Sequence, residues 1–229
     1  MRETFHDELD HVGQSLVEMN SLVSAAIATA TTALLDADLS LAEQVISEDD
    51  RIDAVRDELE AKAFDLMARQ QPVAGDLRIL VTSLRMVADL ERMGDLALHI
   101  AKVARMRYPS SAVPAELHAT IREMGQVAER IVAKAGDAIA GKDIALAEEL
   151  EHDDDAMDAL HRQLFTTLLS DEWPHGMEPA IDTTLIGRYY ERFADHAVSV
   201  ARRVIYLVTG EMPPPPTLDT GSTETALGL

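Results

Sequence analysis

Four pairs of acidic residues, each spaced four apart, are the side chains of this sequence most able to do chemistry. A spacing of four returns two side chains to one face of an α-helix, about 6 Å apart along its axis. Oxygen ligands suit hard cations such as Mg²⁺, Mn²⁺, Ca²⁺ or iron, and helical bundles hold di-iron and di-manganese sites between carboxylates of facing helices. The four pairs are Asp49 with Asp53, Glu91 with Asp95, Asp154 with Asp158, and Glu191 with Asp195.

The same pairs also fit a solvated acidic face. Asp and Glu make up 41 of the 229 residues, so several such pairs are expected by chance. Spacing alone therefore leaves metal binding and a solvated surface both open. A ferritin-like di-metal protein is a further alternative, but its Glu-x-x-His spacing occurs at Glu3/His6 and Glu8/His11 on a single helix.

Two histidines lie beside the acidic pairs. His99 follows Asp95 by four residues and is expected to face the same way, so it is a candidate member of that patch. His196 is adjacent to Asp195 and points about 100° away, which favours a surface or interface role.

The acidic pairs belong to an internal repeat. Displacing the sequence by 105 residues aligns 41–55 with 146–160, with identities at seven of fifteen positions. A displacement of 100 then aligns 91–101 with 191–201, including the second acidic pair of each copy. The chain is therefore predicted to be two copies of one unit, each with two acidic pairs on two different helices.

Helical periodicity covers the chain between breaks rich in Gly, Pro and Asp, and no alternating β-branched segment competes with it. The fold class is therefore predicted to be all-α. Asp76 and Asp143 are predicted N-caps, and Pro114 suits a first helical turn. The predicted helices span 3–35, 39–70, 76–107, 115–140, 144–171 and 180–209.

The short connections predict six antiparallel helices arranged as two tandem three-helix bundles. The first bundle is expected over residues 1–110 and the second over 111–210. Residues 211–229 contain four consecutive prolines followed by Thr, Gly and Ser, and are predicted to form a disordered tail.

Composition excludes several functions. With 20 Lys and Arg against 41 Asp and Glu, the net charge is −21, so nucleic acid and anionic lipid would be repelled. No cysteine is present, which excludes disulfides, thiolate metal sites and a cysteine nucleophile. The N-terminus lacks the pattern of a signal peptide, so a cytoplasmic protein is expected.

No catalytic constellation is recognisable. The sequence contains no glycine-rich phosphate loop, and no Ser-His-Asp arrangement can be placed. The chain is therefore predicted not to be an enzyme.

Two stretches resemble the PhoU family of phosphate transport system regulatory proteins. The first is Gln71-Pro72-x-Ala74-x-Asp76-Leu77-Arg78, and the second is Leu90-Glu91-Arg92-Met93-Gly94-Asp95. The Glu/Asp-x-x-x-Asp motifs of that family match all four acidic pairs, and the resemblance covers residues 1 to about 210.

The resemblance implies a cytoplasmic regulator that links the ATPase subunit of a phosphate ABC transporter to a sensor histidine kinase. Such a regulator holds the phosphate-starvation response off and moderates phosphate uptake. The resemblance also implies iron or zinc, or another divalent cation such as Mg²⁺ or Mn²⁺, on the acidic motifs, and a homodimer. A metal-free helical adaptor is the remaining alternative.

The second copy departs from the family pattern in two places. Ala194 stands where Gly94 precedes the aspartate of the first copy, so the extra methyl group is expected to alter that site. Residues 178–183 replace the lead-in to the third helix, so the two bundles are not expected to bind partners equivalently.

Overall fold

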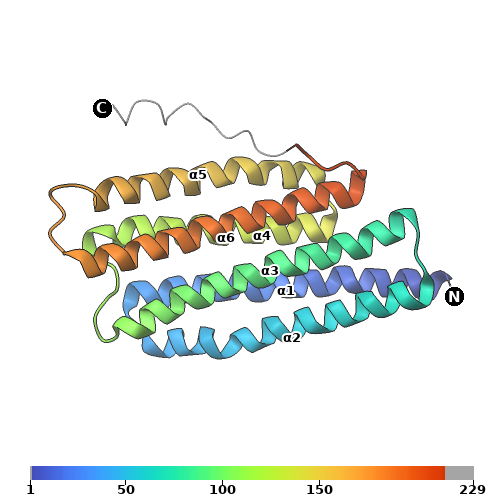
Figure 1. Ribbon diagram of the computed structural model, residues 1–229, viewed down its shortest axis with the longest axis horizontal. Helices are drawn as coiled ribbons and strands as arrows, with labels where there is room; N and C mark the ends of the chain where they lie inside the picture. Colours follow the sequence, from blue (N-terminus) through green and yellow to red (C-terminus); the bar gives the residue numbers. More distant parts are fainter. Residues whose placement is uncertain (1, 215–229) are drawn as a thin grey trace.

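Six long helices form the protein. The computed structural model describes residues 2–214, and describes side chains from residue 5 onward. A short 3₁₀ helix, η1 (Ala115–Leu117), leads into the fourth helix. The long helices are α1 (Arg2–Asp36), α2 (Leu39–Gln70), α3 (Ala74–Arg107), α4 (His118–Gly141), α5 (Ile144–Leu168) and α6 (Met177–Thr209) (Figure 1). The all-α fold class predicted from the sequence is confirmed.

The helix boundaries follow local chemistry. The side chain of Asp143 accepts a hydrogen bond from the Leu146 amide at 3.1 Å, and Asp38, its equivalent in the first repeat, accepts one from Leu41 at the same distance. The predicted cap at Asp76 is wrong, because α3 begins at Ala74 and Asp76 lies within its first turn. There its carboxylate still faces the positive end of the helix dipole.

The ends of α5 and α6 also differ from prediction. α5 ends at Leu168, three residues early, and α6 begins at Met177, three residues early. Pro179 lies in the first turn of α6, where a helix requires no backbone N–H from it, so this proline does not exclude the earlier start.

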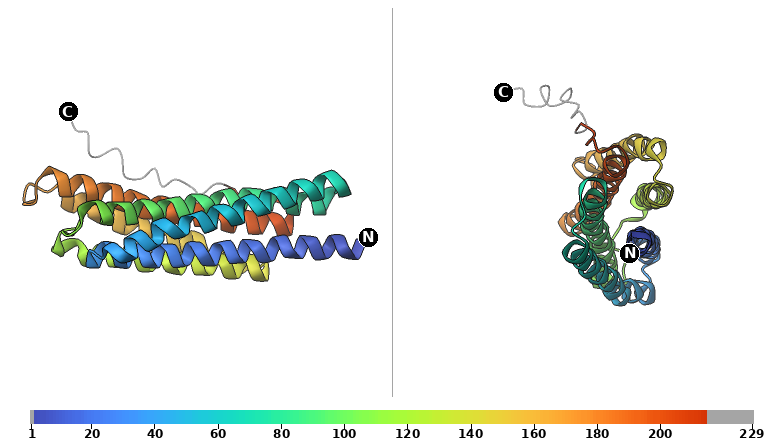
Figure 2. Two further views of the ribbon diagram at one scale, coloured as in Figure 1. Left: turned by 90° about the horizontal axis from the view of Figure 1, so that it is seen from below. Right: turned by 90° about the vertical axis from the view of Figure 1, so that its right-hand side faces the viewer.

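Four helices form the centre of the molecule. α1 packs against α3, α3 against α6, α6 against α4, and α4 against α1. α2 covers α1 and α3 at one edge, and α5 covers α4 and α6 at the other. Figure 2 shows α3 and α6 on one side, α1 and α4 on the other. Two three-helix bundles, α1–α3 and α4–α6, are thus joined side by side, and the predicted boundary at residue 110 falls in the connection between them.

The two bundles share one core. Buried apolar side chains from all six helices form a continuous cluster. A buried hydrogen bond of 2.7 Å joins Thr31 of α1 to Tyr190 of α6. Because the Thr31 hydroxyl donates to the Ile27 carbonyl, the Tyr190 hydroxyl must be the donor between them. Burial raises the pKa of Tyr190, which keeps that proton in place.

A pseudo-two-fold axis relates the repeats. Arg78 at the start of α3 donates to the Leu207 carbonyl near the end of α6, and Arg107 at the end of α3 bonds Glu178 at the start of α6. The displacement of 100 residues maps position 78 to 178 and 107 to 207, so the two contacts join equivalent pairs of positions, one through a backbone carbonyl and the other through two side chains. Such reciprocity requires that α3 and α6 run antiparallel about an axis between them.

Residues 211–214 are not helical, and the rest of the predicted tail lies outside the described residues. Among residues 2–214, no helix combines the length and apolarity needed to cross a membrane.

Candidate functional site

The structure brings the eight predicted acids together as two clusters, one in each repeat. In each, a pair on the second helix of the repeat faces a pair on the third. The first carboxylate cluster is Asp49 and Asp53 of α2 with Glu91 and Asp95 of α3; the second is Asp154 and Asp158 of α5 with Glu191 and Asp195 of α6.

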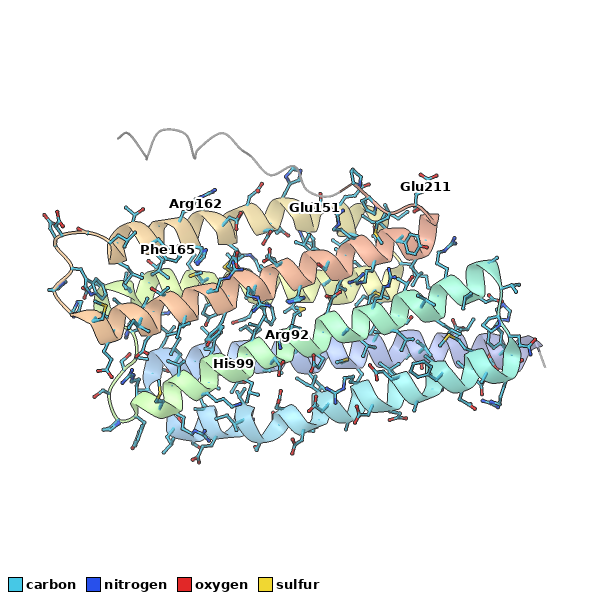
Figure 3. All side chains as sticks on the ribbon, viewed as in Figure 1. Arg92, His99, Glu151, Arg162, Phe165 and Glu211 are labelled. Carbon is cyan, nitrogen blue, oxygen red and sulfur yellow. The ribbon has the colours of Figure 1, made fainter. Side chains whose placement is uncertain are left out.

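An arginine bridges the first cluster. Nη1 of Arg56 donates to Asp53 Oδ1 at 2.7 Å and to Glu91 Oε1 at 3.1 Å, joining α2 to α3. Arg92 donates to Asp95 Oδ2 at 2.8 Å from the solvent side. Figure 3 shows Arg92 midway along α3. Three of the four carboxylates thus have a cationic partner within the chain.

Burial and crowding raise two pKa values in this cluster. Burial is the main cause of the raised pKa of Asp49, followed by the charges of Asp53 and Asp95. Burial also raises the pKa of Glu91, and Asp95 adds to the effect while Arg56 opposes it. The ionised carboxylates of Asp49 and Glu91 are therefore disfavoured unless a cation lies close to them.

The second cluster has less internal compensation. Arg188 donates to Glu191 Oε1, while Oε2 of Glu191 is buried and has no hydrogen-bond partner. Burial, followed by the charges of Asp158, Asp195 and Glu191, raises the pKa of Asp154 to about 7. The pKa values of Glu191 and Asp195 are raised as well, chiefly by burial.

His161 is a member of the second cluster that the sequence reasoning missed. Its Nε2 is buried without a hydrogen-bond partner, and the Asp158 and Asp195 charges act on the ring. Burial nonetheless lowers the pKa of His161, with Arg188 contributing. The signal was available: His161 follows Asp158 by three, as Arg56 follows Asp53, and the displacement of 105 aligns His161 with Arg56.

The Gly94/Ala194 difference is accommodated within the helix packing. A methyl group on Gly94 would lie 3.0 Å from Ile52 Cδ1 and 3.8 Å from Asp49 Oδ1, so α2 and α3 approach closely here. In the second repeat the position equivalent to Ile52 carries Met157, whose unbranched side chain adapts to irregular space, and Ala194 is fully buried.

The two neighbouring histidines lie in the contact between α3 and α6. His99 Nδ1 contacts the Asp95 backbone carbonyl, and its ring packs on Tyr189 with centroids 5.3 Å apart. His99 therefore faces α6 (Figure 3), away from the first carboxylate cluster. His196 Nδ1 lies 3.1 Å from Asp89 Oδ1, which places it in the interface as expected.

The fit of a metal ion differs between the clusters. Within residues 2–214, no three His, Asp or Glu side chains converge, as they stand, to hold one ion. In the first carboxylate cluster Arg56 already takes the place of a cation. In the second, Glu191 has an unpaired carboxylate oxygen, and Asp154, Asp158 and Asp195 lie close enough to act on one another, so these oxygen donors fit a divalent cation once side-chain rotations draw them together.

Comparisons with known proteins give matches over most of the chain. A family model described as the PhoU domain matches residues 16–104 and 121–204. The phosphate-specific transport system accessory protein PhoU homolog 2 of Mycobacterium tuberculosis is 50% identical over 213 residues, covering 93% of this chain and 100% of that one. PhoU homolog 1 of Mycobacterium leprae is 48% identical, covering 93% and 96%.

Solved structures show the same fold. The crystal structure of PhoU from Pseudomonas aeruginosa superposes with a TM-score of 0.80 at 32% identity, covering 90% of this chain and 100% of that one. The phosphate transport system regulatory protein PhoU from Streptococcus pneumoniae gives 0.78 at 27% identity, covering 92% and 99%.

Proposed function

The chain belongs to the PhoU family, and we propose that it is a cytoplasmic accessory protein of the phosphate-specific transport system. It binds the ATPase subunit of the transporter and a sensor histidine kinase, holds the phosphate-starvation response off and moderates phosphate uptake. It performs this role as a regulator and not as an enzyme. Association of two copies into a homodimer stays a prediction.

The observation that carries this proposal is the pair of carboxylate clusters. They occupy equivalent positions in the two repeats, all of their acids except the exposed Asp158 and Asp195 are partly buried, and they belong to a protein with a net charge of −21. Partly desolvated carboxylates with raised pKa values gain most from a cationic partner, because the partner removes the penalty that burial imposes. The clusters are therefore docking sites for Lys and Arg of the membrane-associated partners.

A divalent cation at the clusters is part of the proposal. Asp154, Asp158, Glu191 and Asp195 of the second cluster would hold it, and Asp49, Asp53, Glu91 and Asp95 would do so once Arg56 had moved aside. Iron, zinc, Mg²⁺ or Mn²⁺ there would supply positive charge that offsets part of the carboxylate charge and leaves the remaining carboxylates available to Lys and Arg of the partners. The chain's own residues orient the donors from two helices and exclude water on the core side.

Replacement of both Glu91 and Asp95 by Lys tests the docking role. The double variant should fail to capture the ATPase subunit and the kinase while its helicity stays intact. The control replaces Glu43 and Glu58, two exposed acids of α2, by Lys, which makes the same change in net charge. Capture undiminished by the Glu91/Asp95 change would refute the proposal.

Elemental analysis of protein purified without a metal-affinity tag tests the cation, together with melting in the presence and absence of chelator. A bound ion raises the apparent stability, and chelation removes that gain. Metal with oxygen consumption would instead support the ferritin-like alternative. Metal-free protein insensitive to chelator would support the simple helical adaptor.

A further inference from the structure

The N-terminal part of α1 extends past the end of α4. Gly125 of α4 lies against Thr31 of α1. Gly136, further along α4, lies against Asn20, so the two helices run antiparallel. Since α4 ends about one and a half turns after Gly136, residues 2–14 of α1 have no part of α4 beside them. Figure 2 shows this overhang at the N-terminal end of α1.

A groove with a volume of 940 Å³ lies along this part of α1, between α1, α3, the α4–α5 turn and the end of α6. It follows α1 from His6 to Ser21, a length of about 22 Å. Its volume is near the upper end of the range for ligand-binding pockets, about 300 to 1,000 Å³. The groove contacts both repeats, and its floor is apolar: Leu9, Leu16, Ile79, Met86, Val204 and Leu207.

The walls of the groove carry more negative than positive charge. Asp10 and Glu18 of α1 and Asp76 of α3 line it. Among the described residues that line it, Lys142 is the only lysine or arginine, and α1 contributes none. Arg78 borders the groove but donates to a backbone carbonyl of α6. A ligand that matches these walls is therefore cationic.

One buried hydroxyl group faces the groove. Ser83 of α3 lines it and is only 3% exposed. Within the part of the chain that the structure describes, this side chain has no hydrogen-bond partner. Buried hydroxyl groups are normally hydrogen-bonded, because an unpaired one loses its hydration without compensation. The Ser83 hydroxyl is therefore available to accept a hydrogen bond from a ligand N–H group.

The acids of the groove are too far apart to hold one small ion. Asp10 and Glu18 are about 12 Å apart along α1. No three His, Asp or Glu side chains converge on one point anywhere in the described residues. A ligand that reaches both acids needs separated positive charges, with apolar segments between them that contact the floor. An alkyl chain that carries several ammonium groups has both properties.

We propose that this groove binds a linear aliphatic polyamine. Its ammonium groups pair with Asp10, Glu18 and Asp76, one of its N–H groups donates to the Ser83 hydroxyl, and its methylene segments lie on the apolar floor. The site shares no residue with either carboxylate cluster, so the inference goes beyond the proposed function and does not depend on it. Because the ligand contacts both repeats, its binding stabilises the folded chain.

The experiment measures the binding of spermine to the full-length chain by titration calorimetry. Asp10→Asn with Glu18→Gln should weaken binding by about tenfold or more, because two charge-assisted hydrogen bonds are lost. The control is Glu43→Gln with Glu58→Gln, which makes the same change in net charge at two exposed acids of α2 and should leave the affinity near wild type. Lys142→Gln should strengthen binding, because it removes a repulsive charge.

Two further variants test the groove itself. A methyl group on Gly13, which lines the groove, would meet nothing within 4 Å, so Gly13→Trp fills the groove without displacing a helix. It should abolish spermine binding and keep the melting temperature, whereas Ala61→Trp, at an exposed position of α2, should bind as wild type does. Ser83→Ala should weaken binding by about threefold to tenfold and leave melting unchanged, because no hydrogen bond within the chain is lost.

A wild-type chain that does not bind spermine would overturn the inference, and so would undiminished binding in Gly13→Trp. Weaker binding in Lys142→Gln would show that the groove prefers an anion. Loss of binding in Glu191→Gln would place spermine at the second carboxylate cluster, and an equal loss in the Glu43/Glu58 control would show that spermine responds only to overall charge. Each of these results contradicts the inference but leaves the proposed function standing, because none of the measurements involves the transporter or the kinase.

Discussion

Arg56 and His161 occupy equivalent positions in the two repeats, but only Arg56 forms ion pairs with neighbouring carboxylates. Arg56 joins Asp53 to Glu91, whereas the Nε2 atom of His161 is buried and has no hydrogen-bond partner. The permanent positive charge of Arg56 therefore compensates carboxylates of the first cluster. His161 is a weaker base and does not supply an equivalent positive charge to the second. The two halves share a backbone but differ in charge compensation.

Replacement of Arg56 by Met should lower the melting temperature by a few degrees, because Asp53 and Glu91 lose the guanidinium that bridges them. Added Mn²⁺ should recover most of the loss in the variant and should raise the melting temperature of the wild type less. Calorimetry with and without Mn²⁺ measures both effects. Arg69→Met, which breaks an ion pair with the exposed Asp65, is the control and should change little. Identical responses to Mn²⁺ in Arg56→Met and wild type would contradict this account.

The raised pKa of Asp154 makes stability depend on pH. Its carboxyl holds a proton up to about pH 7 in the folded protein but only up to about 3.8 in the unfolded chain. The folded state therefore binds more protons between these values, so the free energy of unfolding falls as pH rises from about 4 to about 7, and stays reduced above that.

Asp154→Asn should remove much of the dependence of the free energy of unfolding on pH. It should also raise the melting temperature at pH 8 in the presence of chelator. Melting at a series of pH values measures it. Asp155→Asn alters the next residue, whose side chain is 83% exposed and whose charge makes the smallest contribution to the raised pKa of Asp154, so it should reduce the pH dependence only slightly. A pH profile that is the same in Asp154→Asn and wild type would show that another group is responsible.

Arg107 closes one end of the α3–α6 contact. Its Nε and Nη2 atoms donate to the two carboxylate oxygens of Asp182 at 2.5 and 3.1 Å, and Asp182 is 5% exposed. Arg107→Met should lower the urea midpoint clearly, because a buried carboxylate is left without its counter-ion. Glu178→Gln removes the exposed partner of the same arginine and should change the midpoint little. Equal falls in the urea midpoint for Arg107→Met and Glu178→Gln would contradict the conclusion that burial makes the ion pair with Asp182 the more important one.

Gly125 sets the distance between α1 and α4. A methyl group there would lie 2.5 Å from Thr31 Cγ2, so Gly125→Ala should disturb the hydrogen bond between Thr31 and Tyr190. We expect a loss of about 1 to 3 kcal/mol in the free energy of unfolding, despite the higher helix propensity of alanine. Gly13→Ala, where nothing lies within 4 Å, should instead stabilise the protein by up to about 1 kcal/mol. Denaturant titration distinguishes the two directions.

Much of the fold follows from local chemistry. Asp143 could be identified as a cap from its position before an apolar run, and the displacements of 105 and 100 residues placed the two acidic pairs of each copy on equivalent helices. The single core could not be predicted in this way. Periodicity shows that α1 has an apolar face, but not that the face divides between α3 and α4.

Helical spacing was sufficient to predict which acidic residues of the site lie on the same face of one helix. Asp49 and Asp53 could be paired because they lie on one helix, and the repeat indicated partners for them. The bridge from Arg56 to Glu91 depends on how closely α2 approaches α3, which the packing at Gly94 and Ile52 decides. The burial that leaves Glu191 Oε2 unpaired also arises from tertiary packing, which no spacing rule contains.

The reciprocal contacts of Arg78 with Leu207 and of Arg107 with Glu178 have an evolutionary consequence. Two separate copies of a three-helix chain could meet through the same contacts, with α1 and α3 of each copy buried against the other. The present molecule has the arrangement of such a dimer, with its two halves joined by the ten residues 108–117 between α3 and α4. Within one chain the sequences of the two halves can differ, as arginine at position 56 and histidine at position 161 do.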